Sequence, residues 1–142
     1  MKKKIVLISC VSKKETEACK AKDMYVSPLF KMSWEYTKQF SPDKVFILSA
    51  KHHLLDPEKR IAPYNVTLYK FAAAERKAWA QRVLSDLEAA GLEHDEFVLL
   101  AGKKYYEYLL GEGGIRNFTL PLHGHGGIGC ILKYLKEQTS KL

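Results

Sequence analysis

The stretch Phe46-Ile-Leu-Ser-Ala-Lys-His-His-Leu-Leu-Asp-Pro57 joins a short apolar run to a cluster of polar side chains. The run up to Leu48 is typical of a strand buried in a sheet. Ser49, Lys51 and His52 follow at once, and the next residues form a proline-containing segment that carries Tyr64. Buried strands that end in this way deliver polar groups to the rim of a sheet, so the stretch predicts a site at that rim.

Working outward from this stretch, apolar runs and helical periodicity alternate along the chain. The predicted strands are residues 5–9, 44–50, 96–101 and 118–122. The predicted helices are residues 28–40, 71–90 and 103–110, and a last helix that begins near residue 128. Ser27 is a natural N-cap, Gly91 is a natural C-cap, and residues 10–26 and 51–69 are predicted to be loops. The alternation predicts a single α/β domain over residues 1–142: a three-layer sandwich whose mostly parallel sheet of four or slightly more strands has helices on both faces.

Composition narrows the class of protein. The chain has 142 residues and a formal net charge of +7, which favours an anionic partner such as a nucleotide or nucleic acid. Its apolar runs fall far short of the ~20 residues of a membrane span, and residues 5–10 are too short for a signal-peptide core, so we expect a cytoplasmic protein without a membrane partner. Its three cysteines contain no C-x-x-C pair, which argues against a disulfide framework. No motif indicates a cofactor or an oligomeric state.

Polar and glycine residues follow every predicted strand. They are Cys10, Ser12, Lys13 and Lys14 after the first, Ser49, Lys51, His52 and His53 after the second, Gly102, Lys103 and Lys104 after the third, and His123, Gly124, His125, Gly126 and Gly127 after the fourth. In parallel α/β sheets, ligands bind beyond the carboxyl ends of the strands. Four of the five histidines are therefore expected along one ligand-binding edge.

The loop of residues 123–129 is a candidate anion site. Glycine lets backbone N–H groups approach a ligand closely, and the N-terminus of a helix favours negative charge. Gly124, Gly126 and Gly127 are therefore expected to bind a phosphate or carboxylate, with Ser12, Lys13 and Lys103 as further contacts. The alternative is a tight turn that needs positive φ angles. The loop matches neither G-x-G-x-x-G nor a Walker motif.

The candidate catalytic residues are His52, His125 and Cys10. Imidazole titrates near neutral pH and suits acid–base chemistry, although two adjacent histidines usually point apart. A cysteine near lysines can be a nucleophile, but it can equally be a small buried residue that closes a strand. A zinc site made of Cys10, His52, His123 and His125 is conceivable but has no supporting spacing, so no metal is expected.

Aromatic and hydroxyl residues complete the predicted site. Tyr25 and Tyr64 are candidates for stacking on a base, a contact worth roughly 1–3 kcal/mol in single-strand binding. Either tyrosine could instead be packing that holds a long loop in place. Ser49 is expected to contact the ligand from the end of the second strand.

Four segments carry a resemblance to a known family. They are Ile8-Ser-Cys-Val-Ser-Lys-Lys14, Asp23-Met-Tyr-Val-Ser-Pro-Leu-Phe30, Leu48-Ser-Ala-Lys-His-His-Leu-Leu-Asp-Pro57 and Ile61-Ala-Pro-Tyr-Asn-Val-Thr-Leu68. Together they resemble a family of small uncharacterised bacterial and phage proteins that is known mainly as a domain of unknown function. The resemblance covers nearly the whole chain, including residues 100–103 and the last glycine-rich loop and helix.

Two better-known groups are more distantly similar. The peroxide-stress YaaA family has a comparable Leu-Ser-Gly…Gly-Leu…Pro…Ile-x-Pro-Tyr stretch, and this resemblance implies DNA binding. The lysine-transferring domain of archaeosine synthase, which acts on a 7-deazaguanine base in tRNA, has a Pro-Cys…Tyr…Ser…His loop. In this chain Ser9 replaces that proline, Ser27 lies one residue nearer the tyrosine, and Phe30 stands near the histidine position. What the resemblance implies is the location of a site, in the loops of residues 10–27 and 49–64.

The leading hypothesis is a protein that binds a nucleotide, nucleoside or nucleic-acid base at the carboxyl edge of its sheet. The residues are compatible with a transferase or hydrolase that processes a modified base or its glycosidic linkage, and equally with a protein that only binds. The alternative is a non-enzymatic DNA- or RNA-binding protein associated with stress or phage. A third possibility is an interaction module that has no ligand.

Overall fold

The computed structural model describes residues 2–11, 14–111 and 113–140. Its main sheet has five strands in the order β4-β3-β1-β6-β7. Strands β1 (Lys4–Ser9), β3 (Lys44–Ser49), β6 (Glu96–Leu100) and β7 (Phe118–Thr119) are parallel, and β4 (His53–Leu55) runs antiparallel at one edge. The prediction of a mostly parallel sheet in an α/β domain is confirmed.

Strand β1 is the centre of the hydrophobic core. Ile5, Val6, Leu7 and Ile8 are almost completely buried. On one side Val6 is paired with Val45 of β3, and on the other with Val98 of β6. Both faces of such a strand are covered by helices, which explains why its sequence is continuously apolar instead of alternating.

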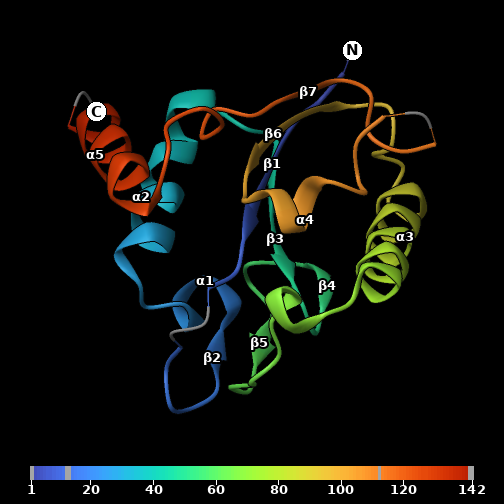
Figure 1. Ribbon diagram of the computed structural model, residues 1–142, viewed down its shortest axis with the longest axis horizontal. Coiled ribbons are helices and arrows are strands. Elements are labelled where there is room, and N and C mark those ends of the chain that lie inside the picture. The colour runs from blue at the N-terminus through green and yellow to red at the C-terminus, as the bar shows by residue number, and fades with distance from the viewer. Residues whose placement is uncertain (1, 12–13, 112, 141–142) are drawn as a thin grey trace.

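Helices cover both faces of the sheet (Figure 1). Helices α2 (Pro28–Tyr36) and α5 (Ile128–Thr139) pack against each other on one face, and α3 (Ala73–Ala89) lies on the opposite face, where it contacts α4 (Lys103–Tyr106). Ser27 caps α2 as expected, since its Oγ accepts a hydrogen bond from the Phe30 amide at 3.2 Å. No helix in the described part of the chain is both long enough and apolar enough to cross a membrane.

The connections between strands change direction at β1. The chain passes from β1 through α2 to β3 on one side, and then returns through α3 to β6 on the other side. The connection that follows β1 and the connection that follows β6 therefore run toward opposite edges of the sheet. The boundary between these two neighbouring strands is the topological switch point. In open α/β sheets, the crevice beyond the strand ends at this point is the usual place for a ligand.

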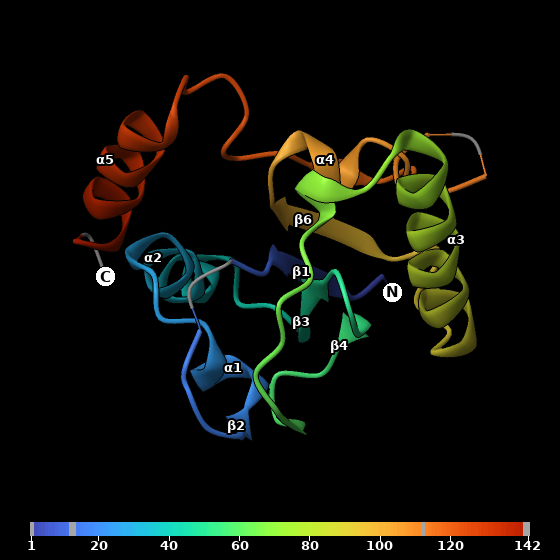
Figure 2. The same cartoon turned by 60° about the horizontal axis from the view of Figure 1, so that its bottom comes forward.

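The two segments that were predicted as loops contain more structure than expected. Residues 10–26 hold β2 (Cys19–Lys20) and α1 (Ala21–Met24), and residues 51–69 hold β4, β5 (Arg60–Ile61) and a short 3-10 helix, Leu68–Lys70. Strands β2 and β5 pair with each other and join the two segments (Figure 2). Because His53 adopts a positive φ of 63°, the chain reverses after β3 without a glycine or asparagine to signal the turn.

Two other predicted elements are shorter than expected. The strand predicted at residues 118–122 is only Phe118–Thr119, and Pro121 removes a backbone donor just beyond it. The helix predicted at residues 103–110 ends at Tyr106.

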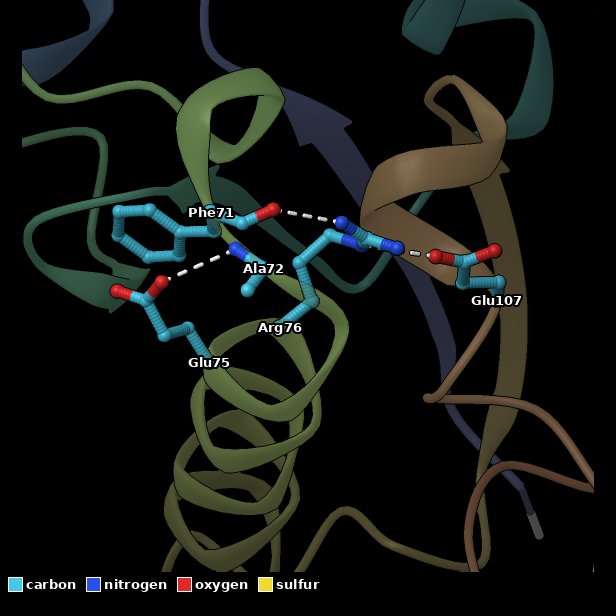
Figure 3. A network of polar contacts seen from close by, with 5 residues as sticks. All are labelled: Phe71, Ala72, Glu75, Arg76 and Glu107. Atoms are coloured by element: carbon cyan, nitrogen blue, oxygen red, sulfur yellow. Dashed lines mark hydrogen bonds and ion pairs between the residues drawn. The ribbon is translucent and has the colours of Figure 1, made fainter.

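A polar network holds the start of α3 against α4 (Figure 3). Arg76 donates from Nε to Glu107 Oε1 at 2.9 Å and from a terminal guanidinium nitrogen to the Phe71 carbonyl at 2.7 Å. Glu75 Oε1 accepts a hydrogen bond from the Ala72 amide at 3.0 Å, which satisfies one free donor at the helix start. The Arg76 and Glu107 side chains are only 12% and 20% exposed, so both charges depend on this pairing.

We expect Arg76→Met to lower the free energy of unfolding by about 1–3 kcal/mol, because it leaves Glu107 largely buried without its partner. Arg82→Met is the matched control in the same helix, since the Arg82–Asp86 pair has a 63% exposed arginine side chain and should contribute less than about 0.5 kcal/mol. Urea denaturation of both variants measures the difference. Equal losses in the two variants would show that the network does not fasten α4.

Candidate functional site

A cavity of about 540 Å³ lies at the switch point, beyond the carboxyl ends of β1 and β6. We call it the switch-point pocket. Cys10 borders it after β1, Gly102 and Lys103 after β6, Ser27 at the start of α2, and Gly126 at the start of α5. Its volume lies within the range of roughly 300–1,000 Å³ that is typical of small-molecule sites.

Aromatic rings form much of the wall of this pocket. Phe30, Tyr69, Tyr105 and Tyr106 all line it. Tyr69 is 66% exposed, and its ring meets the buried ring of Tyr105 edge to face at 6.3 Å. Trp79 packs edge to face against Tyr105, with ring centroids 5.7 Å apart. The pocket therefore offers a fixed aromatic surface with one exposed ring at its border.

Cys10 and Tyr105 form a polar pair in the pocket wall. The Cys10 Sγ and Tyr105 Oη atoms are 3.3 Å apart. Both residues are buried, and burial together with the neighbouring Cys10 raises the pKa of Tyr105 above its usual range. Tyr105 therefore stays a neutral phenol that can donate a hydrogen bond to a thiolate or to a ligand oxygen.

The glycine-rich loop before α5 forms the polar end of the pocket. His123, Gly124 and Gly126 line the pocket, and Gly127 is the N-cap of the helix. Gly124 and Gly126 have φ angles of 86° and 88°, a conformation that side chains other than glycine rarely adopt. The loop is thus a tight turn with positive φ angles. It also presents a helix N-terminus to the pocket.

A second group of polar residues lies at the carboxyl end of β3. Tyr64 Oη is 2.6 Å from Tyr25 Oη and 2.8 Å from Ser49 Oγ. We call Tyr25, Ser49 and Tyr64 the hydroxyl cluster. Ser49 is completely buried, and its Oγ also accepts hydrogen bonds from the amides of Lys51 and His52, at 3.3 Å and 3.0 Å. Burial raises the pKa of both tyrosines.

Basic side chains surround the Tyr64 ring. The ammonium nitrogen of Lys14 lies 4.5 Å from the ring centroid, and that of Lys51 lies 5.9 Å from it. The His52 ring meets Tyr64 edge to face at 5.4 Å, and its buried Nε2 has no hydrogen-bond partner among the described residues. Burial, followed by the charges of Lys59 and Lys51, lowers the pKa of His52.

The structure distributes the residues predicted from the sequence between these two groups. Cys10, Lys103, Gly124 and Gly126 line the switch-point pocket, while Tyr25, Ser49 and Tyr64 form the hydroxyl cluster, with His52 beside it. His125 is held by the Pro121 carbonyl, 2.9 Å from its Nε2, and its ring lies 4.1 Å from that of Tyr134. Ser12 and Lys13 lie outside the described residues.

Sequence reasoning did not assign the tyrosines of the pocket wall to the site. Tyr105 and Tyr106 fall in the helix predicted at residues 103–110, and Tyr69 is the last residue of the loop predicted at residues 51–69. One available signal was position, since Tyr105 lies only five residues after the end of β6 at Leu100. Among the described residues, no group of three or more histidine, cysteine, aspartate or glutamate side chains is arranged to hold a metal ion.

The fold and the pocket together define a doubly wound α/β protein with a ligand-sized cavity at its switch point. The chain belongs to DUF6884, a family of unknown function whose model matches residues 5–137. A search of curated proteins and a search of solved structures found no match to the chain.

The position of His52 has a consequence for acid stability. The pKa values of His52 and His53 are lowered from the ordinary 6.5, so at pH values just below 6.5 the unfolded chain binds protons that the folded chain does not. The free energy of unfolding should therefore fall as the pH falls through 6.5 toward the lower folded-state pKa, and this effect is absent at higher pH.

We expect His52→Gln to reduce this loss of stability between about pH 7 and pH 5. Thermal unfolding midpoints of both proteins across that range measure it, with His94→Gln as the control for removing one histidine. If wild type and His52→Gln lose stability in parallel, His52 does not titrate on unfolding.

Proposed function

We propose that this protein binds a nucleotide, nucleoside or nucleic-acid base in the switch-point pocket. The observation that carries the proposal is the pairing of an aromatic wall with a cationic, glycine-rich end inside one cavity of about 540 Å³. A base needs a flat apolar surface, and a phosphate needs backbone donors and positive charge.

The anion end of the proposed site is formed by Lys103 and the loop that includes Gly124 and Gly126. Both glycines lie at positive φ immediately before α5, which leaves the backbone open to a ligand. The helix N-terminus contributes a favourable potential for a phosphate. The net charge of +7 also favours a negatively charged ligand, although it does not indicate where on the protein that ligand binds.

The base end is formed by the exposed Tyr69 ring and by Tyr105 and Tyr106. Stacking of a base on an aromatic side chain is worth roughly 1–3 kcal/mol and tolerates different bases. The distant resemblance to the base-modifying domain of archaeosine synthase supports a base as ligand, and the resemblance to YaaA proteins supports a nucleic-acid context.

If the bound molecule also reacts, Cys10 is the nucleophile that the pocket offers, and the neutral Tyr105 hydroxyl, 3.3 Å away, can donate a hydrogen bond to its sulfur. The reaction class would then be transfer or hydrolysis at the base or its glycosidic linkage. His52 and His125 are less directly placed for this role, since neither lines the pocket, whereas His123 does.

Lys103→Ala is expected to weaken binding of nucleoside 5′-monophosphates about 5- to 20-fold, because one charge-assisted contact is lost. Binding of the uncharged nucleosides should not change. Isothermal titration of adenosine, guanosine and their monophosphates measures both effects. Lys104→Ala is the matched control, since Lys104 is exposed and does not line the pocket. The proposal fails if none of these compounds binds the wild-type protein, or if the two lysine variants behave alike.

A second candidate function is DNA or RNA binding without catalysis, which the net charge of +7 favours. Binding of this kind releases counterions, so the affinity for a duplex should fall steeply between about 50 and 200 mM salt. Fluorescence anisotropy with labelled duplex DNA and RNA measures the slope. Binding of a free nucleotide that is insensitive to salt, without duplex binding, would exclude this alternative.

A further inference from the structure

The hydroxyl cluster has no part in the nucleotide proposal, because none of Tyr25, Ser49 and Tyr64 lines the switch-point pocket. Its three oxygens are buried or half-buried at the end of β3, and they lie within 2.6–2.8 Å of one another along a chain from Ser49 through Tyr64 to Tyr25. Buried polar groups of this kind normally have every donor matched to an acceptor.

Among the described residues, the hydrogen bonds of the cluster leave one donor without an acceptor. Ser49 Oγ accepts from the amides of Lys51 and His52, so both of its lone pairs are occupied and its own proton must go to Tyr64 Oη. The link between Tyr64 and Tyr25 uses one phenolic proton. The other phenolic proton remains, and Ser49 has no lone pair left to accept it.

The surroundings of this remaining proton provide more donors. The Lys14 ammonium, which lies 4.5 Å from the centroid of the Tyr64 ring and 5.9 Å from that of Tyr25, can only donate. Burial raises the pKa values of both tyrosines, so both hydroxyls keep their protons at physiological pH and each still has an O–H to donate. A spare phenolic O–H beside an ammonium group matches the needs of a ligand oxygen that carries negative charge.

We propose that Tyr25 and Tyr64, oriented by Ser49 and assisted by Lys14, form a subsite for an oxyanion, the carboxylate or phosphate oxygen of a ligand. Ser49 is a positioning residue, because its proton is used within the cluster. The subsite does not depend on what occupies the switch-point pocket.

The subsite lies next to the pocket without being part of it. Cys10, which lines the pocket, is close enough to Tyr25 and Tyr64 to contribute, after burial, to the raised pKa of each. The Tyr25 ring also contacts Phe30 of the pocket wall, with centroids 5.0 Å apart.

The test uses protein labelled with ¹³C at the Cζ atom of every tyrosine, with signals assigned through single Tyr→Phe variants. Sodium phosphate and sodium acetate are titrated separately, with sodium chloride as the ionic-strength control. Saturable shifts of the Tyr25 and Tyr64 signals with one common affinity are expected for at least one of the two anions. Comparing the two anions identifies whether the subsite prefers phosphate or carboxylate.

Two variants test the assignment of donors. Tyr64→Phe should weaken the anion affinity about tenfold, and Lys14→Gln should weaken it by a similar factor while leaving the buried hydroxyls in place. Tyr134→Phe is the matched control, because it removes a phenol from a second hydrogen-bonded tyrosine pair, Tyr36–Tyr134, whose oxygens are also 2.6 Å apart. It should leave the affinity unchanged.

The same labelled protein separates this inference from the proposed function. Nucleoside titrations report on the pocket through Tyr69, Tyr105 and Tyr106, whereas the anion titrations report on the cluster through Tyr25 and Tyr64. The inference is overturned if neither anion shifts the cluster signals more than chloride does, whatever the pocket signals show. That result would assign the spare proton to a bound water.

Discussion

The buried Ser49 residue is the constraint on which the carboxyl edge of the sheet at β3 depends. Its Oγ accepts hydrogen bonds from the amides of Lys51 and His52 and binds Tyr64, and its carbonyl oxygen accepts a hydrogen bond from Trp79 Nε1 at 2.8 Å. One residue thus shapes the turn after β3, positions a tyrosine of the next loop and anchors helix α3. Because Ser49 is 0% exposed, water cannot replace any of these bonds without opening the core.

The fold was predictable from the sequence to the extent that local signals agree with the tertiary structure. The continuously apolar run of β1 and the Ser27-Pro28 cap each indicate one structure only, and both are confirmed. The hairpin to β4 was not predictable, since it turns on a histidine at positive φ and on hydrogen bonds to the Ser49 side chain. Both determinants arise only in the folded protein, and neither has a distinctive sequence pattern.

The sequence could predict at which edge of the sheet the candidate site lies. It could not predict that the residues at this edge would separate into the switch-point pocket and the hydroxyl cluster. The strand ends predicted Cys10, Lys103 and the glycine loop at one edge of the sheet, and these residues line one cavity. They could not indicate that Tyr25 and Tyr64 would be bound to each other, because that contact depends on how two long loops fold over the sheet. The pocket tyrosines were missed for a related reason: no local pattern distinguishes Tyr105 and Tyr106 in a predicted helix, or Tyr69 at the end of a predicted loop, from tyrosines that only pack.

The pairing of β2 with β5 joins the segment of residues 10–26 to the segment of residues 51–69. Beyond the ladder, the Ala21 amide donates to the Lys59 carbonyl at 2.7 Å and the Lys22 amide to the Pro57 carbonyl at 2.9 Å, while Glu58 binds Lys20 and Lys22. Because each segment holds the other's backbone in register, replacing one of them by itself would disturb both. A sequence change that alters the backbone of one segment therefore needs a matching change in the other.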